Sequence, residues 1–103
     1  MQNSTYAPVY CAIYPALANV VRSHGYALAI HGSLSRDMDL ICIPWVEKPS
    51  KPNIVVKDIT KNFNIRLIGK PENKLHNRIA YTISIGHGEC ALDLSFMPTV
   101  NYI

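Results

Sequence analysis

A chain of 103 residues, 49% hydrophobic and 17% charged, has room for one small domain with a modest core and lacks the composition of a disordered protein. Its net charge of +3 is mild, but eight of its ten Lys and Arg residues lie from Lys48 to Arg78, against only Asp58 and Glu72. Such a basic segment suits a polyphosphate or nucleic-acid partner, or simply a solvated surface.

The first predicted element is a helix over residues 4–24. Ser4 or Thr5 can cap its start, and Gly25 is a typical stop. Pro15 is expected to kink this helix or to divide it into two. The apolar residues near three-and-four spacing, which we expect to face the core, are Val9, Ile13, Leu17, Val20 and Val21.

Two short strands are predicted next, over residues 26–30 and 37–44. The turn between them, residues 31–36, is so short that we expect them to be antiparallel. Residues 45–53 contain two prolines and should form a loop. Trp45, at its start, is expected to anchor the edge of the core or, alternatively, to stack on a base. Residues 54–65 have helical apolar spacing.

The last elements form a predicted hairpin. Residues 69–77 read as a loop, after which Ile79, Tyr81, Ile83 and Ile85 alternate with smaller or polar residues. The segment Gly86-His87-Gly88 should make the turn, and residues 89–96 the return strand.

These elements predict one domain over residues 1–103, of the α+β class. The expected fold is a small, mixed, mostly antiparallel sheet of about four strands packed on two helices, in the order helix, strand, strand, helix, strand, strand. Such a small domain is also compatible with a homodimer, through an exposed sheet face or helix.

The cysteines and the N-terminal segment bear on the compartment. Cys11, Cys42 and Cys90 are far apart and lack the spacing of a zinc site. We expect reduced, buried thiols, which favour a cytoplasmic location. Pro8 and Pro15 interrupt the uncharged first residues, and no uncharged run reaches the length of a membrane span, so neither a signal peptide nor a membrane partner is expected.

Three carboxylates form the candidate site. Asp37 and Asp39 share one face of their strand, and Asp93 stands between Leu92 and Leu94 in the last strand. If the two strands are neighbours, the carboxylates converge, and their repulsion calls for a cation. Oxygen ligands of this kind suit magnesium or manganese, in two ions that bridge the acids and nucleotide phosphates. The alternative is a polar turn that caps a hairpin.

The turn before these acids is a candidate phosphate cradle. Gly32 permits close backbone approach, and the Ser33 hydroxyl beside exposed amides can hold phosphate oxygens. His31 adjoins this pair and is a candidate to touch a phosphate or merely to cover the turn. A Gly-Ser pair also occurs in ordinary hairpin turns, so its position between a strand end and the acids is what gives it weight.

These residues carry a resemblance to a known family. The segments "LAIHGSLSRDMDLICI" and "ALDLSF" resemble the nucleotidyltransferase superfamily of DNA polymerase β type, and most of all its minimal single-domain members, such as small proteins common in phage genomes. That family carries a hydrophobic strand, Gly-Ser, an Asp-x-Asp flanked by apolar residues, and later an Asp between apolar residues. All of these features occur here in that order, between about residues 26 and 97.

The resemblance implies a metal-dependent nucleotidyltransferase. Such an enzyme moves a nucleoside monophosphate from a nucleoside triphosphate to a hydroxyl acceptor, here unidentified, which nucleic acid or a protein would supply, and it releases pyrophosphate. Carried over residue by residue, Gly32 and Ser33 become the phosphate-binding turn, and Asp37 and Asp39 become metal ligands. Asp93 becomes the third ligand and helps to activate the acceptor hydroxyl.

The spacing departs from the family pattern in one place. Most members have roughly ten residues between Gly-Ser and the first Asp, including the start of a helix whose N-terminus helps to bind phosphate. Here only Leu34, Ser35 and Arg36 intervene. We therefore expect a turn in place of that helix, with Arg36 as a substitute phosphate contact.

This departure keeps other functions open. One is a catalytically degenerate member of the fold that binds nucleotide, nucleic acid or a protein partner without chemistry. Another is a metal-dependent nuclease, because three acids and metal ions also suit phosphodiester cleavage. The nuclease gives the Gly-Ser pair no required role and ranks last.

Overall fold

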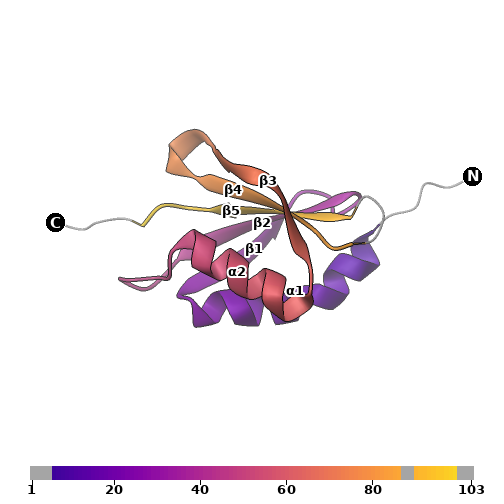
Figure 1. The fold of residues 1–103 in the computed structure, drawn as a ribbon, viewed down its shortest axis with the longest axis horizontal. Coiled ribbons are helices and arrows are strands. Elements are labelled where there is room, and N and C mark those ends of the chain that lie inside the picture. The colour runs from indigo at the N-terminus through magenta and orange to yellow at the C-terminus, as the bar shows by residue number, and fades with distance from the viewer. Residues whose placement is uncertain (1–5, 87–89, 100–103) are drawn as a thin grey trace, which may run out of the picture.

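The computed structural model describes residues 6–86 and 90–99. It has two layers, a five-stranded sheet and two helices, and both helices lie on the same face of the sheet (Figure 1). In the described part of the chain, no helix covers the opposite face, which we call the open face. The expected α+β class is confirmed.

Helix α1 spans Ala7–Ser23. Pro8 lies in its first turn, where a proline costs no hydrogen bond, and Gly25 follows its end with φ +92°, as the sequence predicts. The helix runs through Pro15 without a break, so the predicted division is wrong. Its N-cap is Tyr6, while Ser4 and Thr5 lie outside the described residues.

The buried face of α1 differs from the predicted one near the start of the helix, where Tyr10 is buried instead of Val9. Leu17 and Val21 are buried as expected, and Ile13 and Val20 are partly buried. Val9, however, is 37% exposed, while its neighbour Tyr10 is fully buried. A tyrosine is buried at low cost where its hydroxyl finds partners, and Tyr10 has two, described below.

Strands β1 (Tyr26–His31) and β2 (Asp37–Pro44) pair antiparallel, as predicted. A loop follows β2 and leads to helix α2, Pro52–Phe63. The predicted helix is therefore confirmed, although it begins two residues earlier than expected, with a proline in its first turn. It ends at Asn64, which adopts a left-handed conformation.

The sheet contains a fifth strand, β3 (Arg66–Asn73), where the sequence predicted a loop over residues 69–77. All eight of its residues are exposed, and its pairing with β4 shifts between Ile68 and Glu72. An exposed edge strand with a bulge shows no alternation of apolar and polar residues, so pattern reading misses it. A short 3-10 turn, Leu75–Asn77, then leads to β4.

Strands β4 (Ile79–Ser84) and β5 (Ala91–Phe96) form the predicted antiparallel hairpin. Its predicted turn at His87 and Gly88 and the start of its return strand lie outside the described residues. The sheet order is β1-β2-β5-β4-β3, and among the strands of the described residues only β2 and β5 pair in parallel. The sheet is thus mixed and mostly antiparallel as expected, but with five strands rather than four.

The core lies between the helices and the sheet. Alternate residues of β2 and β5 are buried there, together with Val55, Val56 and Ile59 of α2. All three cysteines are free; Cys42 and Cys90 are buried as predicted, whereas Cys11 is exposed on α1, which corrects the expectation for that residue. Within the described residues, no helix combines the length and apolarity needed to cross a membrane.

Candidate functional site

The three candidate carboxylates lie on two adjacent parallel strands. Asp39 of β2 and Asp93 of β5 are direct cross-strand partners, and Asp37 is opposite Ala91. Residues two apart on a strand, and paired residues on neighbouring strands, share a face of the sheet. Because the alternate residues Met38, Leu40 and Leu92 are buried under the helices, all three acids occupy the open face.

The surroundings of Asp93 disfavour its charged form. Burial and then the carboxylate of Asp39 raise the pKa of Asp93, and Glu72 adds to this. The charges of Lys74 and His31 act in the opposite direction and lower the pKa. Residues of three strands, and Lys74 just after β3, therefore act on one carboxylate in the middle of the open face.

The donor set fits a hard divalent cation, since carboxylate oxygens are the ligands that magnesium and manganese prefer. Asp39 and Asp93 are the pair that would hold it, with Asp37 two residues earlier on the same face. Yet within residues 6–86 and 90–99, no three His, Cys, Asp or Glu side chains stand close enough to share one ion. The side chains as placed offer a two-carboxylate site with a third acid beside it.

Gly32 is fitted against the carboxylate of Asp39. Its φ is +80°, and a Cβ at this position would lie 2.7 Å from Asp39 Oδ2. The left-handed backbone strains any side chain here, and an added Cβ would also require the Asp39 carboxylate to turn away. The glycine thus brings the backbone of the turn directly onto an acid of the site, while its close approach to a phosphate stays a prediction.

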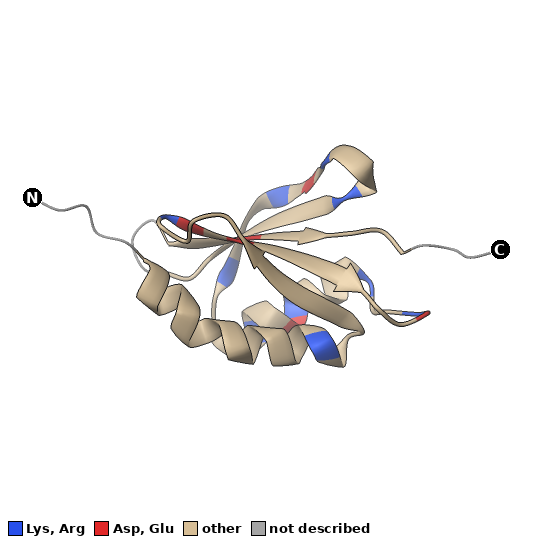
Figure 2. Cartoon of the chain, turned by 180° about the vertical axis from the view of Figure 1, so that it is seen from behind, with Lys and Arg blue, Asp and Glu red and all other residues tan. Residues whose placement is uncertain are grey.

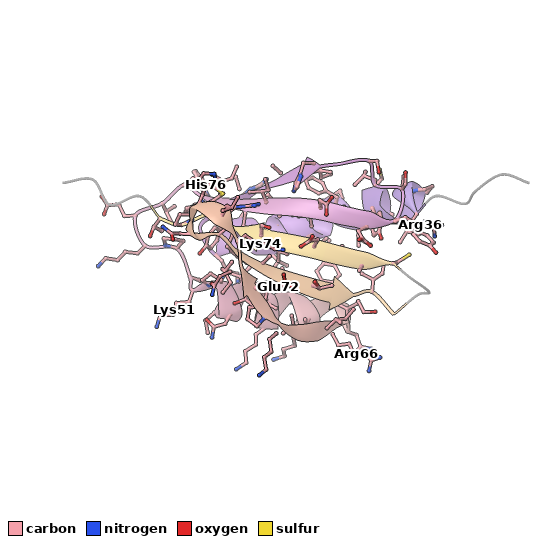
Figure 3. The ribbon with its side chains drawn as sticks, turned by 90° about the horizontal axis from the view of Figure 1, so that it is seen from above. Arg36, Lys51, Arg66, Glu72, Lys74 and His76 are labelled. Carbon is pink, nitrogen blue, oxygen red and sulfur yellow. The ribbon has the colours of Figure 1, made fainter. Side chains whose placement is uncertain are left out.

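The rest of the turn places the other predicted binding residues. Residues 32–36 contain no helix, as the short spacing predicts. Ser33 is exposed, and its Oγ accepts a hydrogen bond from the Ser35 N–H at 3.3 Å. His31 is the cross-strand partner of Asp39 and so belongs to the open face, while Arg36 is exposed at the start of β2 (Figure 3).

Tyr10 of α1 connects the chain just before β2 with the start of β5 through hydrogen bonds, a role that sequence reasoning missed. Its buried hydroxyl donates a hydrogen bond to the carbonyl of Arg36 and accepts one from the N–H of Ala91 at 3.1 Å. Burial raises the pKa of Tyr10 to about 12. One side chain from α1 thus joins the first residues of β2 and β5, and it helps to set the register in which Asp39 and Asp93 are opposite each other.

Glu72 of β3 and Lys74, which follows that strand, also act on Asp93. Lys74 Nζ lies 3.0 Å from Glu72 Oε2, and both side chains remain substantially exposed. Viewed from above (Figure 3), the two labelled residues lie on the open-face side of the molecule, away from Arg36. Because β3 was not predicted from the sequence, no sequence signal connected Lys74 or Glu72 to Asp93.

The remaining lysines and arginines are mostly elsewhere. They lie largely on α2, the loop before it and the β3–β4 segment, whereas α1 has only Arg22 near its end (Figure 2). The basic middle of the sequence is therefore divided between both sides of the sheet. Only part of it is available to a ligand on the open face.

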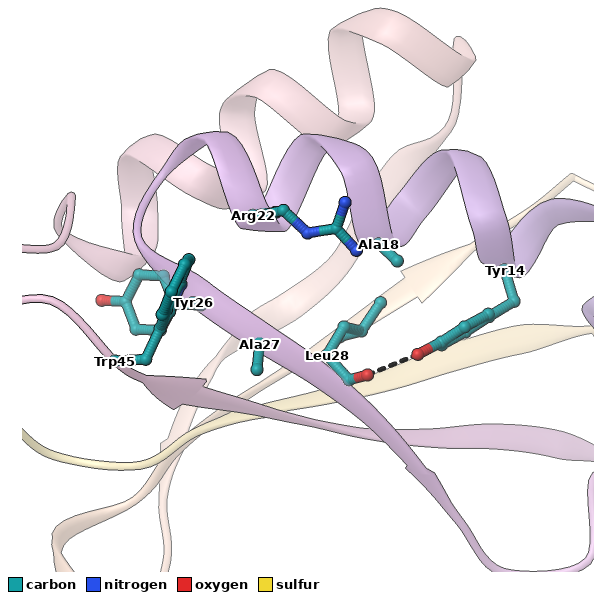
Figure 4. A pocket seen from close by; sticks show the side chains of 7 residues that line it. All are labelled: Tyr14, Ala18, Arg22, Tyr26, Ala27, Leu28 and Trp45. Atoms are coloured by element: carbon teal, nitrogen blue, oxygen red, sulfur yellow. Dashed lines mark hydrogen bonds between the residues drawn. The ribbon is translucent and has the colours of Figure 1, made fainter.

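A hollow lies between α1 and the edge strand β1 (Figure 4), away from the three acids. Trp45 lines it and is 63% exposed, so the expectation that Trp45 anchors the edge of the core is wrong. Tyr14 donates a hydrogen bond to the Leu28 carbonyl there, which covers part of the edge of β1. Arg22 lines the same hollow, distant in sequence from the acids.

No family model matches this chain, and no curated protein matches it.

Proposed function

We propose that this protein is a metal-dependent nucleotidyltransferase, which transfers a nucleoside monophosphate from a nucleoside triphosphate to a hydroxyl acceptor. One observation carries the proposal: Asp39 and Asp93 are cross-strand partners on the open face, and the turn that contains Gly32 packs against the Asp39 carboxylate. Paired acids beside a close-approaching backbone suit a metal-bound polyphosphate.

The proposed roles follow from the chemistry of each group. Asp39 and Asp93, with Asp37 beside them, would hold magnesium or manganese, which supplies charge neutralisation at the phosphates. Gly32 and Ser33 would bind phosphate oxygens through the turn. In phosphoryl and nucleotidyl transfer, the protein contributes mostly the positioning of groups and the neutralisation of charge, so few other groups are required.

The cations around the acids complete the proposed phosphate site. Arg36 and His31 would bind the leaving pyrophosphate, while Lys74, which pairs with Glu72, lowers the pKa of Asp93 and so favours the charged form that would hold the metal. When the acceptor hydroxyl oxygen bonds to the α-phosphorus, the bond to pyrophosphate breaks, and Asp93 would help to remove the hydroxyl proton. The acceptor stays open between nucleic acid and protein.

A second candidate is a binding protein with this fold and without catalysis. It is favoured by the turn at residues 32–36, which replaces a helix N-terminus, and by the two-carboxylate rather than three-ligand arrangement among the described side chains. Such a protein would bind nucleotide with metal and release no pyrophosphate.

Calorimetric titration of ATP and GTP in the presence of manganese or magnesium tests the proposal. We expect metal-dependent binding by the wild type and a loss of affinity of at least about tenfold in Asp39→Asn, which keeps the shape of the side chain and removes a ligand charge. Asp58→Asn is the matched control, because Asp58 lies on α2, on the far side of the sheet.

The outcomes separate the candidates. Pyrophosphate release with a hydroxyl acceptor supports the transferase, and binding without release supports the non-catalytic protein. Cleavage of a nucleic-acid strand supports the nuclease. If neither nucleotide binds in the presence of metal, both nucleotide proposals are wrong.

A further inference from the structure

The two strands that carry the acids continue into an apolar surface. Along β2 the open-face positions are Asp37, Asp39, Ile41 and Ile43; along β5 they are Ala91, Asp93 and Ser95, followed by Met97. The same face therefore changes from anionic to apolar along the strand direction. At about 3.3 Å per residue, Ile41 lies about 7 Å and Ile43 about 13 Å from Asp39.

A hollow marks the apolar end of these strands. It has a volume of about 340 Å³ and is lined by Ile41, Ile43, Pro44, Met97 and Pro98. This volume is at the lower end of the ~300–1,000 Å³ typical of small-molecule sites. Ile43 is 44% exposed, which is high for a large apolar residue on a sheet.

On the β1 side, small side chains leave this part of the face open, because Ala27 and Ala29 are the partners of Ile43 and Ile41. On the β4 side, Ala80 is the partner of Ser95, and both are buried, with 5% and 7% of their surface exposed. The two isoleucines are therefore accessible from the side of the edge strand β1.

We propose that this hollow is the nucleobase site of the nucleotide whose phosphates bind at Asp39 and Asp93. The inference rests on the proposed function and adds to it the place and the character of base recognition. A ligand with a metal-bound phosphate end and a flat apolar end matches the change of character along β2 and β5. A ribose and one phosphate cover a separation of the order found between the two ends.

The lining predicts weak base selectivity. The side chains at the hollow are aliphatic, proline or methionine, and they offer contact area rather than hydrogen-bond donors. Apolar contact is tolerant of base identity. ATP, GTP, CTP and UTP are therefore expected to bind with similar affinity, with the larger purines somewhat ahead.

The test compares ATP with tripolyphosphate, each titrated with manganese, on the full chain. Ile43→Asn should weaken ATP binding about 3- to 10-fold, because it removes part of the apolar contact, and leave tripolyphosphate binding unchanged. Ile54→Asn is the matched control: Ile54 is also 44% exposed but lies on α2, across the sheet. It should change neither affinity, and thermal unfolding checks that both variants fold.

Each other outcome overturns the inference. If Ile43→Asn leaves ATP binding unchanged while Asp39→Asn abolishes it, the base binds elsewhere and the proposed function stands. Equal weakening of ATP and tripolyphosphate would show a general effect on the acids. If Ile43→Asn instead dissociates a dimer seen by sedimentation, a second copy of the chain occupies the hollow. If the wild type binds neither ATP nor tripolyphosphate, the proposed function is wrong, and so is the nucleobase site that rests on it.

Discussion

At the scale of single residues, the site depends on the contact between Gly32 and Asp39. The glycine combines φ +80° with a missing Cβ that would lie 2.7 Å from the Asp39 carboxylate. The backbone conformation makes substitution costly, and the contact links the shape of the turn to the position of an acid. The contact therefore gives a direct way to test whether the turn and the acid act as one unit.

A residue other than glycine in a left-handed conformation costs about 1–2 kcal/mol. Gly32→Ala should lower the free energy of unfolding by more than this, since Asp39 must also move. In an Asp39→Ala background the cost should fall toward that backbone value, because the contact is gone. Urea unfolding of the four proteins in this double-mutant cycle measures the coupling. Equal costs in both backgrounds would show that the contact has no energetic weight.

Tyr10 is the second residue on which the geometry depends. Tyr10→Phe removes the hydrogen bonds that the hydroxyl makes with the Arg36 carbonyl and the Ala91 N–H, and we expect a loss of about 1–3 kcal/mol in unfolding free energy. Tyr14→Phe is the matched control, since it removes one hydrogen bond to the edge carbonyl of Leu28. A smaller effect for Tyr10→Phe than for Tyr14→Phe would contradict the role given to Tyr10.

The acids show how far residue-level prediction reaches. Alternation places Asp37 and Asp39 on one face, and the burial of their neighbours confirms it. The partnership of Asp39 with Asp93 needs the pairing of β2 with β5, which a single sequence offers only as a supposition. Tyr10 was missed because its partners are backbone groups of residues far away in the chain, and no spacing rule reports them.

At the scale of elements, the two helices are joined by a charged contact. His24 Nε2 lies 2.8 Å from Asp58 Oδ2, and His24 Nδ1 lies 2.7 Å from the Ser50 hydroxyl. The hydrogen bond from His24 lowers the pKa of Asp58. This contact connects the end of α1 to the middle of α2, on the side of the sheet that carries no candidate site residue.

The sign of the pH effect follows from linkage. The folded pKa of Asp58 is below its unfolded value of about 3.9, so the carboxylate stabilises the fold above that pH, and this contribution is lost as the pH falls through the folded pKa. Asp58→Asn should therefore reduce the loss of stability on acidification below about pH 4. Chemical denaturation of both proteins at pH 3 to 6 measures it, and parallel curves would contradict it.

Elements with strong periodicity were predictable, and β3 was not. Ile79, Tyr81 and Ile83 alternate as a half-buried strand must, and helical apolar spacing predicted α2, although its start at Pro52 was placed in a loop. By contrast β3 exposes every residue and contains a bulge, so its pairing with β4 stabilises it without leaving a sequence pattern. Glu72 belongs to this strand and Lys74 follows it, which is why both were missed.

At the scale of the whole molecule, the fold separates two tasks. The helices and the buried face of the sheet hold the core, while the open face collects the acids, the Gly32 turn and the apolar hollow from strands at the centre of the sheet. Because β2 and β5 pair in parallel, the open-face side chains of both strands change from acidic to apolar in the same direction. This arrangement supports one elongated ligand site.

The most direct test is where manganese binds. In amide-resolved NMR of this 11.5 kDa chain, substoichiometric Mn²⁺ should broaden the signals of Gly32, Asp39 and Asp93 first, and Asp39→Asn should remove most of the effect. Broadening centred on Asp58 in α2, or broadening that Asp39→Asn leaves unchanged, would contradict a metal site on the open face.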